Sequence, residues 1–168
     1  DLTENTQPAI FLVGYSIFQI LKKEFNINLN KAKFFAGHSL GEYTALACAG
    51  ALDFSSTLKI LKLRGNAMQT AVPKGEGGML AILGSDINTI EKNFEENKRE
   101  YECFIANDNS NSQIVASGTM ENINKLSKDL TSKKIKNIKL PVSAPFHCNL
   151  MNKATELMKN EIEKLDFK

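Results

Sequence analysis

The sequence predicts a mixed α/β protein in which a small β-α-β-β-α-β unit interrupts a larger core. A strand, a tight turn and a helix are predicted to follow one another around the glycines of residues 37–41. Apolar residues recur at helical spacing on both sides of that turn, over residues 6–25 and 54–72. Beyond a glycine-rich joint at residues 74–78, the pattern changes to short apolar strands that alternate with two capped amphipathic segments.

The first helix is expected over residues 6–25, with Thr6 as its N-cap and Pro8 in its first turn. Its apolar face is broad, which predicts burial between neighbouring elements. An asparagine-rich loop at residues 26–30 leads to a short strand predicted at residues 33–36.

The turn at residues 37–41 reads Gly-His-Ser-Leu-Gly, a G-x-S-x-G pattern that precedes a helix predicted over residues 42–49. We expect Gly37 and Gly41 to be required because a Cβ at either position would clash where strand and helix approach. Ser39 would then lie at the tip of the turn in a strained backbone conformation, near helix amides that favour developing negative charge. The pattern predicts a nucleophile elbow, and the alternative is a chance match.

A further helix is predicted over residues 54–72, with Asp53 as its N-cap and Pro73 as its stop. Arg64 falls in the middle of the apolar sector of this helix. A guanidinium without a partner is costly there, so an anion is expected beside it. The alternatives are a bound ligand, a core-facing carboxylate in a structural ion pair, or a side chain that snorkels out to water.

The inserted unit is expected at residues 77–142, between a core segment at residues 1–76 and a return to the core at residues 143–168. Ser85 and Thr119 are the expected caps of its two helices. In chain order, its strands and helices are predicted at residues 79–83, 85–99, 103–106, 114–117, 119–132 and 135–142. This order is the ferredoxin-like signature. Lysines near the last strand are expected to form a solvated edge, with a docking surface as the alternative: Lys133, Lys134, Lys136 and Lys139.

The chain has two histidines, and they receive different predictions. His147 lies in a turn at residues 143–147, ahead of a helix, and is the natural base to take the Ser39 proton. His38 is expected to be structural or to line the pocket, because neighbouring side chains in a sharp turn point apart. A nucleophile–base pair of Cys148 and His147 is disfavoured for the same reason. The spacing of the histidines matches no zinc site, so no metal is predicted.

Composition excludes several classes of protein. A net charge of +2 is too small to indicate a nucleic-acid partner. No apolar run reaches membrane-spanning length, so no membrane association is predicted. Three cysteines without CxxC spacing predict a reducing, cytoplasmic location. Because the first residue is Asp1, we expect the chain to be a piece of a longer protein.

Four motifs together resemble the malonyl-CoA:acyl carrier protein transacylase family over essentially the whole chain. They are Gly37-His38-Ser39-Leu40-Gly41-Glu42-Tyr43, Leu63-Arg64-Gly65 with Met68-Gln69, Gln113-Ile114-Val115-Ala116-Ser117-Gly118, and Ala144-Pro145-Phe146-His147. The resemblance implies an α/β-hydrolase-like core with a ferredoxin-like insert, Ser39 as the acylated nucleophile, His147 as its base and Arg64 as the clamp for the malonate carboxylate. The amide of Leu40 is expected to hold the oxyanion. Phe146 is similar to the malonyl-selective pattern of related polyketide acyltransferase domains.

The resemblance further implies malonyl-CoA and acyl carrier protein as partners in fatty acid biosynthesis, with coenzyme A as part of the substrate and no cofactor. The alternatives are a serine esterase or thioesterase, an acyltransferase module of a polyketide synthase, and a non-catalytic binder of carrier protein. Two family features are expected outside this chain: the loop that supplies a second oxyanion donor, and the group that orients His147.

Overall fold

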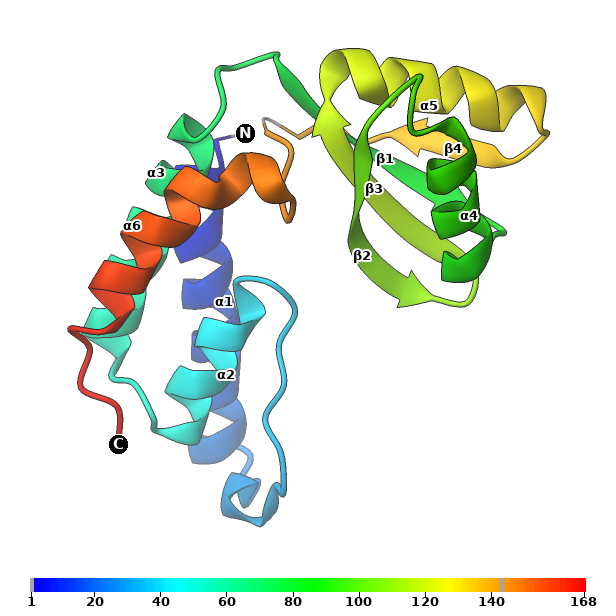
Figure 1. Ribbon diagram of the computed structural model, residues 1–168. Helices are drawn as coiled ribbons and strands as arrows, with labels where there is room; N and C mark the ends of the chain where they lie inside the picture. The colour runs from blue at the N-terminus through cyan, green and yellow to red at the C-terminus, as the bar shows by residue number, and fades with distance from the viewer. Residues whose placement is uncertain (1, 143) are drawn as a thin grey trace. The chain divides into compact units, whose positions relative to one another are not determined.

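The structure is a computed structural model that describes residues 2–142 and 144–168. The chain divides into two compact units (Figure 1). The first contains Asp1–Ala67 and Glu156–Lys168, and the second contains Met68–Thr155. No helix in the described ranges combines the length and the apolar character that a membrane span needs.

Three helices supply the core of the first unit: α1 (Thr3–Lys23), α2 (Gly41–Ala49) and α3 (Phe54–Thr70), of which α3 continues into the second unit. The later part of α6 (Asn152–Ile162) also belongs to the first unit. A 3₁₀ turn, η1 (Leu29–Lys31), precedes the segment that leads into α2. The buried centre of this unit joins one residue from each helix, namely Phe11, Ala47 and Leu61. Residues of all three helices therefore meet in one shared cluster of buried side chains.

Two helix boundaries in this unit bear on the predictions. Asp53 caps α3 as predicted, because its side chain accepts a hydrogen bond from the Ser56 amide at 2.9 Å. The predicted start of α1 at Thr6 is wrong, since the helix begins at Thr3 and includes Pro8 in its interior. The Thr6 hydroxyl donates to the Leu2 carbonyl within the helix instead of capping it. A proline in the helix interior removes one hydrogen bond, and this helix continues through it.

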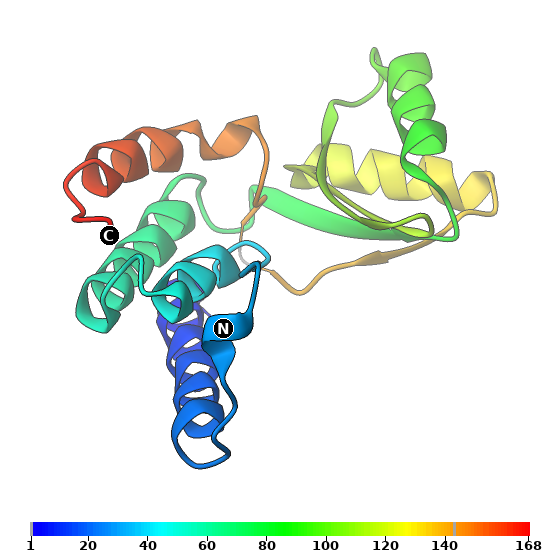
Figure 2. The ribbon, with the colours of Figure 1, turned by 90° about the horizontal axis from the view of Figure 1, so that it is seen from below.

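The strand predicted at residues 33–36 is absent as a strand. The segment has no ladder partner among the described residues, whose strands all lie between residues 77 and 139. It runs beside α2 without a neighbouring strand in both views (Figures 1 and 2). Phe34 is 89% exposed. Apolar pattern alone predicted the strand, but a strand forms only where another backbone pairs with it.

The second unit is a four-stranded antiparallel sheet with two helices. Its elements are β1 (Gly77–Leu83), α4 (Ile87–Asn97), β2 (Cys103–Ser110), β3 (Gln113–Thr119), α5 (Met120–Ser132) and β4 (Lys136–Lys139). The strand order is β2-β3-β1-β4, with antiparallel pairing throughout. This arrangement confirms the predicted ferredoxin-like unit.

Details of this unit differ from the sequence prediction. Thr119 caps α5 as expected, but Asp86, rather than Ser85, accepts the capping hydrogen bond of α4. The polar run predicted as a loop after residue 106 continues β2 to Ser110, with two register shifts against β3. The strand β4 ends at Lys139, earlier than predicted. Backbone pairing with β3 therefore overrides the turn propensity of the asparagines and serines.

The two faces of this sheet have different environments. Leu80 and Ala116 are paired across β1 and β3, and both belong to the core cluster that packs against α4 and α5. Met79 and Ser117 are the adjacent pair, and their side chains point to the opposite face because side chains alternate along a strand. The segment after β4 returns on this side and leads into η2 (Asn149–Met151) and α6 (Asn152–Ile162). The first residue of the predicted turn, Ser143, lies outside the described residues.

Candidate active site

The predicted nucleophile elbow has the expected backbone geometry at Ser39. Its φ is +53°, in the left-handed region that non-glycine residues rarely adopt. Two short backbone hydrogen bonds close the turn, from the Gly41 amide to the His38 carbonyl at 2.8 Å and from the Glu42 amide to the Ser39 carbonyl at 3.2 Å. The serine therefore lies directly before the first turn of α2, where helix amides favour negative charge.

Only one of the two elbow glycines is required for the predicted steric reason. A Cβ on Gly37 would lie 1.9 Å from the carbonyl oxygen of Gly41, which no side chain can tolerate. The same prediction for Gly41 is wrong, because a Cβ there would meet no atom of the described residues within 4 Å. The close approach is made at Gly37, whose Cβ position would meet the backbone of Gly41 and Glu42 at the start of α2.

The guanidinium of Arg64 lies beside the nucleophile. Its Nη2 donates to the Ser39 Oγ at 3.1 Å, and its Nη1 donates to the Gln7 Oε1 at 2.5 Å. Its Cζ lies 5.8 Å from the centre of the Tyr43 ring, a cation–π distance. Three helices thus contribute to one cationic position: α1 through Gln7, α2 through Tyr43 and α3 through Arg64 itself.

The surroundings of Arg64 bear on the three alternatives for this residue. Burial lowers the pKa of its guanidinium, and the nearby Tyr43 and Glu42 partly offset this effect. The ion pairs of the described residues all join lysines to carboxylates, and none includes Arg64. The side chain is half-buried and directed to Ser39. Within the described residues, neither an ion pair nor a fully exposed side chain accounts for Arg64, whose guanidinium is hydrogen-bonded to Gln7 and Ser39. The binding of a ligand anion by Arg64 stays a prediction.

The sequence analysis missed Gln7 as a member of this site. Gln7 is only 3% exposed, and it donates to the Thr3 hydroxyl at 2.9 Å while it accepts from Arg64. A polar residue one helical turn before the fully buried Phe11 could have indicated this role, because a buried amide needs polar partners.

Close packing between α1 and α3 positions this cation. A Cβ on Gly65 would lie 2.5 Å from the Glu4 Cα and 2.7 Å from the Thr3 carbonyl oxygen. Both contacts are to backbone atoms, so a side chain at this position would push the two helices apart. Gly65 is therefore required beside Arg64 for a steric reason.

We expect Gly65→Ala to lower the free energy of unfolding by about 1–3 kcal/mol, the usual cost of overpacking. The same shift would separate Arg64 from Gln7. The matched control is Gly14→Ala in α1, whose Cβ would meet Thr44 at an ordinary 3.5 Å. This control should be neutral or more stable by about 0.5–1 kcal/mol, because alanine favours a helix. Urea titration of both variants tests the prediction, and equal effects would contradict it.

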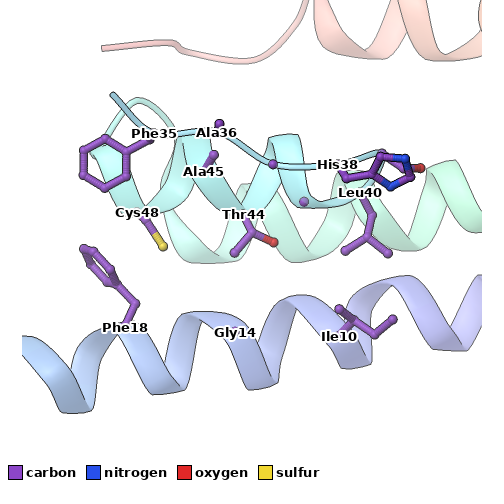
Figure 3. Close-up of a pocket in the computed structure, with 13 residues that line it drawn as sticks. Ile10, Gly14, Phe18, Phe35, Ala36, His38, Leu40, Thr44, Ala45 and Cys48 are labelled. Atoms are coloured by element: carbon purple, nitrogen blue, oxygen red, sulfur yellow. The ribbon is translucent and has the colours of Figure 1, made fainter. Parts of the chain in front are cut away.

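An apolar pocket of about 560 Å³ opens next to the serine. Ser39 contributes to its lining, with His38 and Leu40 at one end and Phe18 and Cys48 at the other (Figure 3). Within the described residues, no backbone carbonyl accepts a hydrogen bond from the Leu40 amide. The position of His38 on the pocket wall agrees with its predicted place, while its role in substrate binding stays a prediction.

His147 belongs to the second unit, in the segment after β4. Its φ is +58°, and its side chain is exposed. The preceding residue, Phe146, is half-buried, and its carbonyl accepts a hydrogen bond from the Ser117 hydroxyl at 2.5 Å. The Cys148 thiol donates to the Pro145 carbonyl at 3.1 Å. Ser39 and His147 lie in different units, and their approach to each other stays a prediction.

Positive φ values outside glycine single out the two predicted catalytic residues. Four described residues have such values. Asn26 and Lys134 follow the ends of α1 and α5, where a left-handed residue is common. Ser39 and His147 follow no helix, and strained residues of this kind cluster at functional sites.

Comparison with known proteins supports the same interpretation. The malonyl CoA-acyl carrier protein transacylase of Salmonella typhimurium is 36% identical over 166 residues, which cover 98% of this chain and 53% of that protein. The crystal structure of an acyl-carrier-protein-S-malonyltransferase from Bartonella henselae is 41% identical, with a TM-score of 0.92, over 99% of this chain and 54% of that one. A malonyl-transacylase solved in complex with a type II PKS acyl-carrier protein is 33% identical, with a TM-score of 0.91, over 99% of this chain and 54% of that one.

The chain spans about half the length of the curated relatives it matches. The family whose sequence pattern it fits is described as the acyl transferase domain, and the match extends over residues 1–167. Since this match includes the elbow, the arginine helix and the histidine segment, the chain belongs to the acyl transferase domain family.

Proposed function

We propose that the protein of which this chain forms part, which we call the parent protein, is a malonyl-CoA:acyl carrier protein transacylase of fatty acid biosynthesis. The observation that carries the proposal is the 3.1 Å contact between the Arg64 guanidinium and the Ser39 hydroxyl. In a malonyl thioester, a single methylene separates the carboxylate from the reacting carbonyl. A cation that holds this carboxylate must therefore lie close to the nucleophile.

The chemistry is a two-step transfer through a covalent intermediate. His147 takes the proton of Ser39 as the serine oxygen attacks the thioester carbonyl, and the Leu40 amide donates to the resulting oxyanion. The carbon–sulfur bond then breaks, and coenzyme A leaves as a thiol after it receives the proton from His147. The product of this half-reaction is a malonyl ester of Ser39. The phosphopantetheine thiol of the carrier protein attacks that ester, with His147 again as the base, and restores the free serine.

Arg64 changes its acceptor during this cycle. In the free site it donates to the Ser39 hydroxyl oxygen and to Gln7. When the serine is acylated, its hydroxyl oxygen becomes an ester oxygen, which is a poorer hydrogen-bond acceptor. The malonyl carboxylate then offers two acceptor oxygens in one plane. A guanidinium fork matches that geometry with two parallel hydrogen bonds. Phe146, next to His147, would restrict space beside the acyl chain and favour an unbranched malonyl group.

The surfaces that this chain leaves exposed support a proposal for the fold of the parent protein. The predicted strand at residues 33–36 has no partner among the described residues, and α1 exposes a row of apolar side chains that includes Val13 at 60%. A row of exposed apolar side chains on one helix is typical of a surface that contacts another part of the protein. We propose that the rest of the parent protein adds strands there and completes an α/β-hydrolase-like core. Residues 1–76 and 143–168 would contribute to this core, and residues 77–142 would form the insert.

The rest of the parent protein would also supply the second oxyanion donor and the group that orients His147. The cytoplasmic location stays a prediction, which is in keeping with the three cysteines being free thiols.

A role in polyketide synthesis is the second candidate. It is favoured by the similarity to the malonyl-transacylase solved with a type II PKS acyl-carrier protein. The chemistry at Ser39 would be the same, and only the identity of the carrier would differ. An esterase or thioesterase would use Ser39 and His147 but has no need of the Arg64 cation.

The experiment that tests the proposal is intact mass spectrometry of the parent protein after incubation with malonyl-CoA. We expect one malonyl adduct per chain, which disappears when holo acyl carrier protein is added and reappears on the carrier. Acetyl-CoA at the same concentration is the control and should label far less. A protein that gains no adduct would contradict the proposal, and so would one that only hydrolyses malonyl-CoA in the presence of carrier.

A further inference from the structure

The segment that carries His147 is attached to the sheet of the second unit by two specific contacts. Ser117 of β3 is fully buried, and its hydroxyl donates to the Phe146 carbonyl at 2.5 Å. The ring of Pro145 packs directly against Gly77 of β1. Only glycine leaves room for this contact, because a Cβ at residue 77 would lie 2.1 Å from the proline Cδ. Both contacts come from the sheet face opposite to α4 and α5.

The hydrogen bond from Ser117 acts on the peptide group directly before His147. The Phe146 carbonyl and the His147 amide belong to the same planar peptide group. A hydrogen bond that holds the carbonyl therefore also fixes the orientation of the amide. That plane defines φ at His147, which is +58°. A residue in this strained conformation persists only where the surrounding structure holds it there.

The choice of serine at this position is informative. On the sheet face that carries Ser117, its neighbour along β3 is Val115 and the residue paired with it on β1 is Met79, and both are apolar and buried. A hydroxyl in such surroundings is unfavourable unless it is hydrogen-bonded. An alanine would fill the same space but would leave the Phe146 carbonyl without this donor. The hydroxyl therefore serves the His147 segment rather than the packing of the sheet.

We propose that Ser117 is a positioning residue for His147, which it places through the Phe146 peptide without touching the substrate. This inference rests on the proposed function, in which His147 is the base for both half-reactions. Loss of the hydrogen bond lets the peptide before His147 rotate and displaces the imidazole from the line of proton transfer. Acyl-CoA binding is left intact, because Ser117 is buried in β3 and the clamp Arg64 is held by other residues.

The test is steady-state transfer by the parent protein with Ser117→Ala, with the exposed Ser112→Ala of the adjacent hairpin as the control. We expect kcat to fall roughly 10- to 100-fold, the usual effect of a displacement of about 1 Å in a catalytic group. The KM for malonyl-CoA and the preference for malonyl over acetyl groups should stay as in the wild type. Ser112→Ala should match the wild type in all three quantities.

A double-mutant cycle separates positioning from a general structural role. Ser117→Ala should have no further effect in a His147→Ala background, because the residue acts only through the imidazole. Ser117→Cys retains a side chain of similar size with a thiol, which is a weaker hydrogen-bond donor than a hydroxyl. It replaces the alanine variant in the same cycle if that variant does not fold. The same fold-loss in both backgrounds would overturn the inference.

The outcomes also distinguish this inference from the proposed function. If His147→Ala abolishes transfer while Ser117→Ala and Ser117→Cys behave as wild type, only the positioning role is wrong. If His147→Ala retains full activity, the assignment of the base fails, and the positioning role fails with it. A loss of kcat on Ser117→Ala that vanishes in the His147→Ala background supports both.

Discussion

Replacement of Ser39 with alanine is expected to abolish covalent labelling of the parent protein by malonyl-CoA. The acyl group has no other oxygen in the same position, so the adduct seen by intact mass spectrometry should disappear. Transfer to the carrier protein should fall by roughly 10³- to 10⁶-fold, the range found when a catalytic nucleophile is removed. The residual rate would come from binding and from the Leu40 amide.

The backbone at Ser39 makes this variant interpretable. Alanine has to adopt the same positive φ as serine, so the strain of the elbow is present in both proteins. We therefore expect the urea midpoint to change little. Ser55→Ala, at an exposed serine of α3, is the matched control and should label normally. An adduct that persists on the Ser39→Ala protein would move the nucleophile elsewhere.

Replacement of Arg64 with alanine is expected to separate malonyl transfer from acetyl transfer. Removal of one partner of a buried, hydrogen-bonded charge pair costs about 2–5 kcal/mol, so malonyl transfer should lose roughly 30- to several-thousand-fold in kcat/KM. Acetyl transfer has no carboxylate to lose and should change by less than about 10-fold. The measurement is the ratio of kcat/KM for the two acyl-CoA substrates.

Two further variants on the same helix sharpen this test. Arg64→Lys keeps the charge but loses the planar fork, so it should recover only part of the malonyl preference. Lys59→Ala removes an exposed positive charge of α3 and controls for the change in net charge. If Arg64→Ala slows both acyl groups by the same factor, Arg64 supports the site as a whole and does not hold the malonyl carboxylate.

The sequence predicted those features that depend on near neighbours in the chain. The positive φ of Ser39, the caps at Asp53 and Thr119 and the antiparallel β-α-β-β-α-β unit could all be inferred from it. Each is set by residues a few positions apart, or by an order of elements that permits few topologies. The inward direction of Arg64 was also foreseen, since helical periodicity alone places it among apolar neighbours.

The failures share a different cause. The segment at residues 33–36 is apolar enough for a strand, but no backbone among the described residues pairs with it. Gly41 was expected to avoid a clash that the actual path of the chain does not create. Gln7 was overlooked because its importance arises from a contact with a residue 57 positions away. The identity of the contacting partner in each case depends on the path of distant segments, which the local sequence does not specify; helical spacing could indicate that Gln7 is buried, but not that Arg64 is its partner.

The amino-acid sequence alone thus specified the chemical groups: a hydroxyl on a strained turn, a guanidinium on an apolar helix face and an imidazole in a loop. Their local conformations follow from short-range sterics and hydrogen bonding. Tertiary structure decided that the guanidinium of Arg64 meets the Ser39 hydroxyl, because α1 and α3 pack closely enough at Gly65 for Gln7 to hold it there. It also decided that a buried serine of β3 holds the peptide before His147. Contacts of this kind arise only when distant segments are packed together, since the energy that fixes them comes from burial and not from the chain's local preferences.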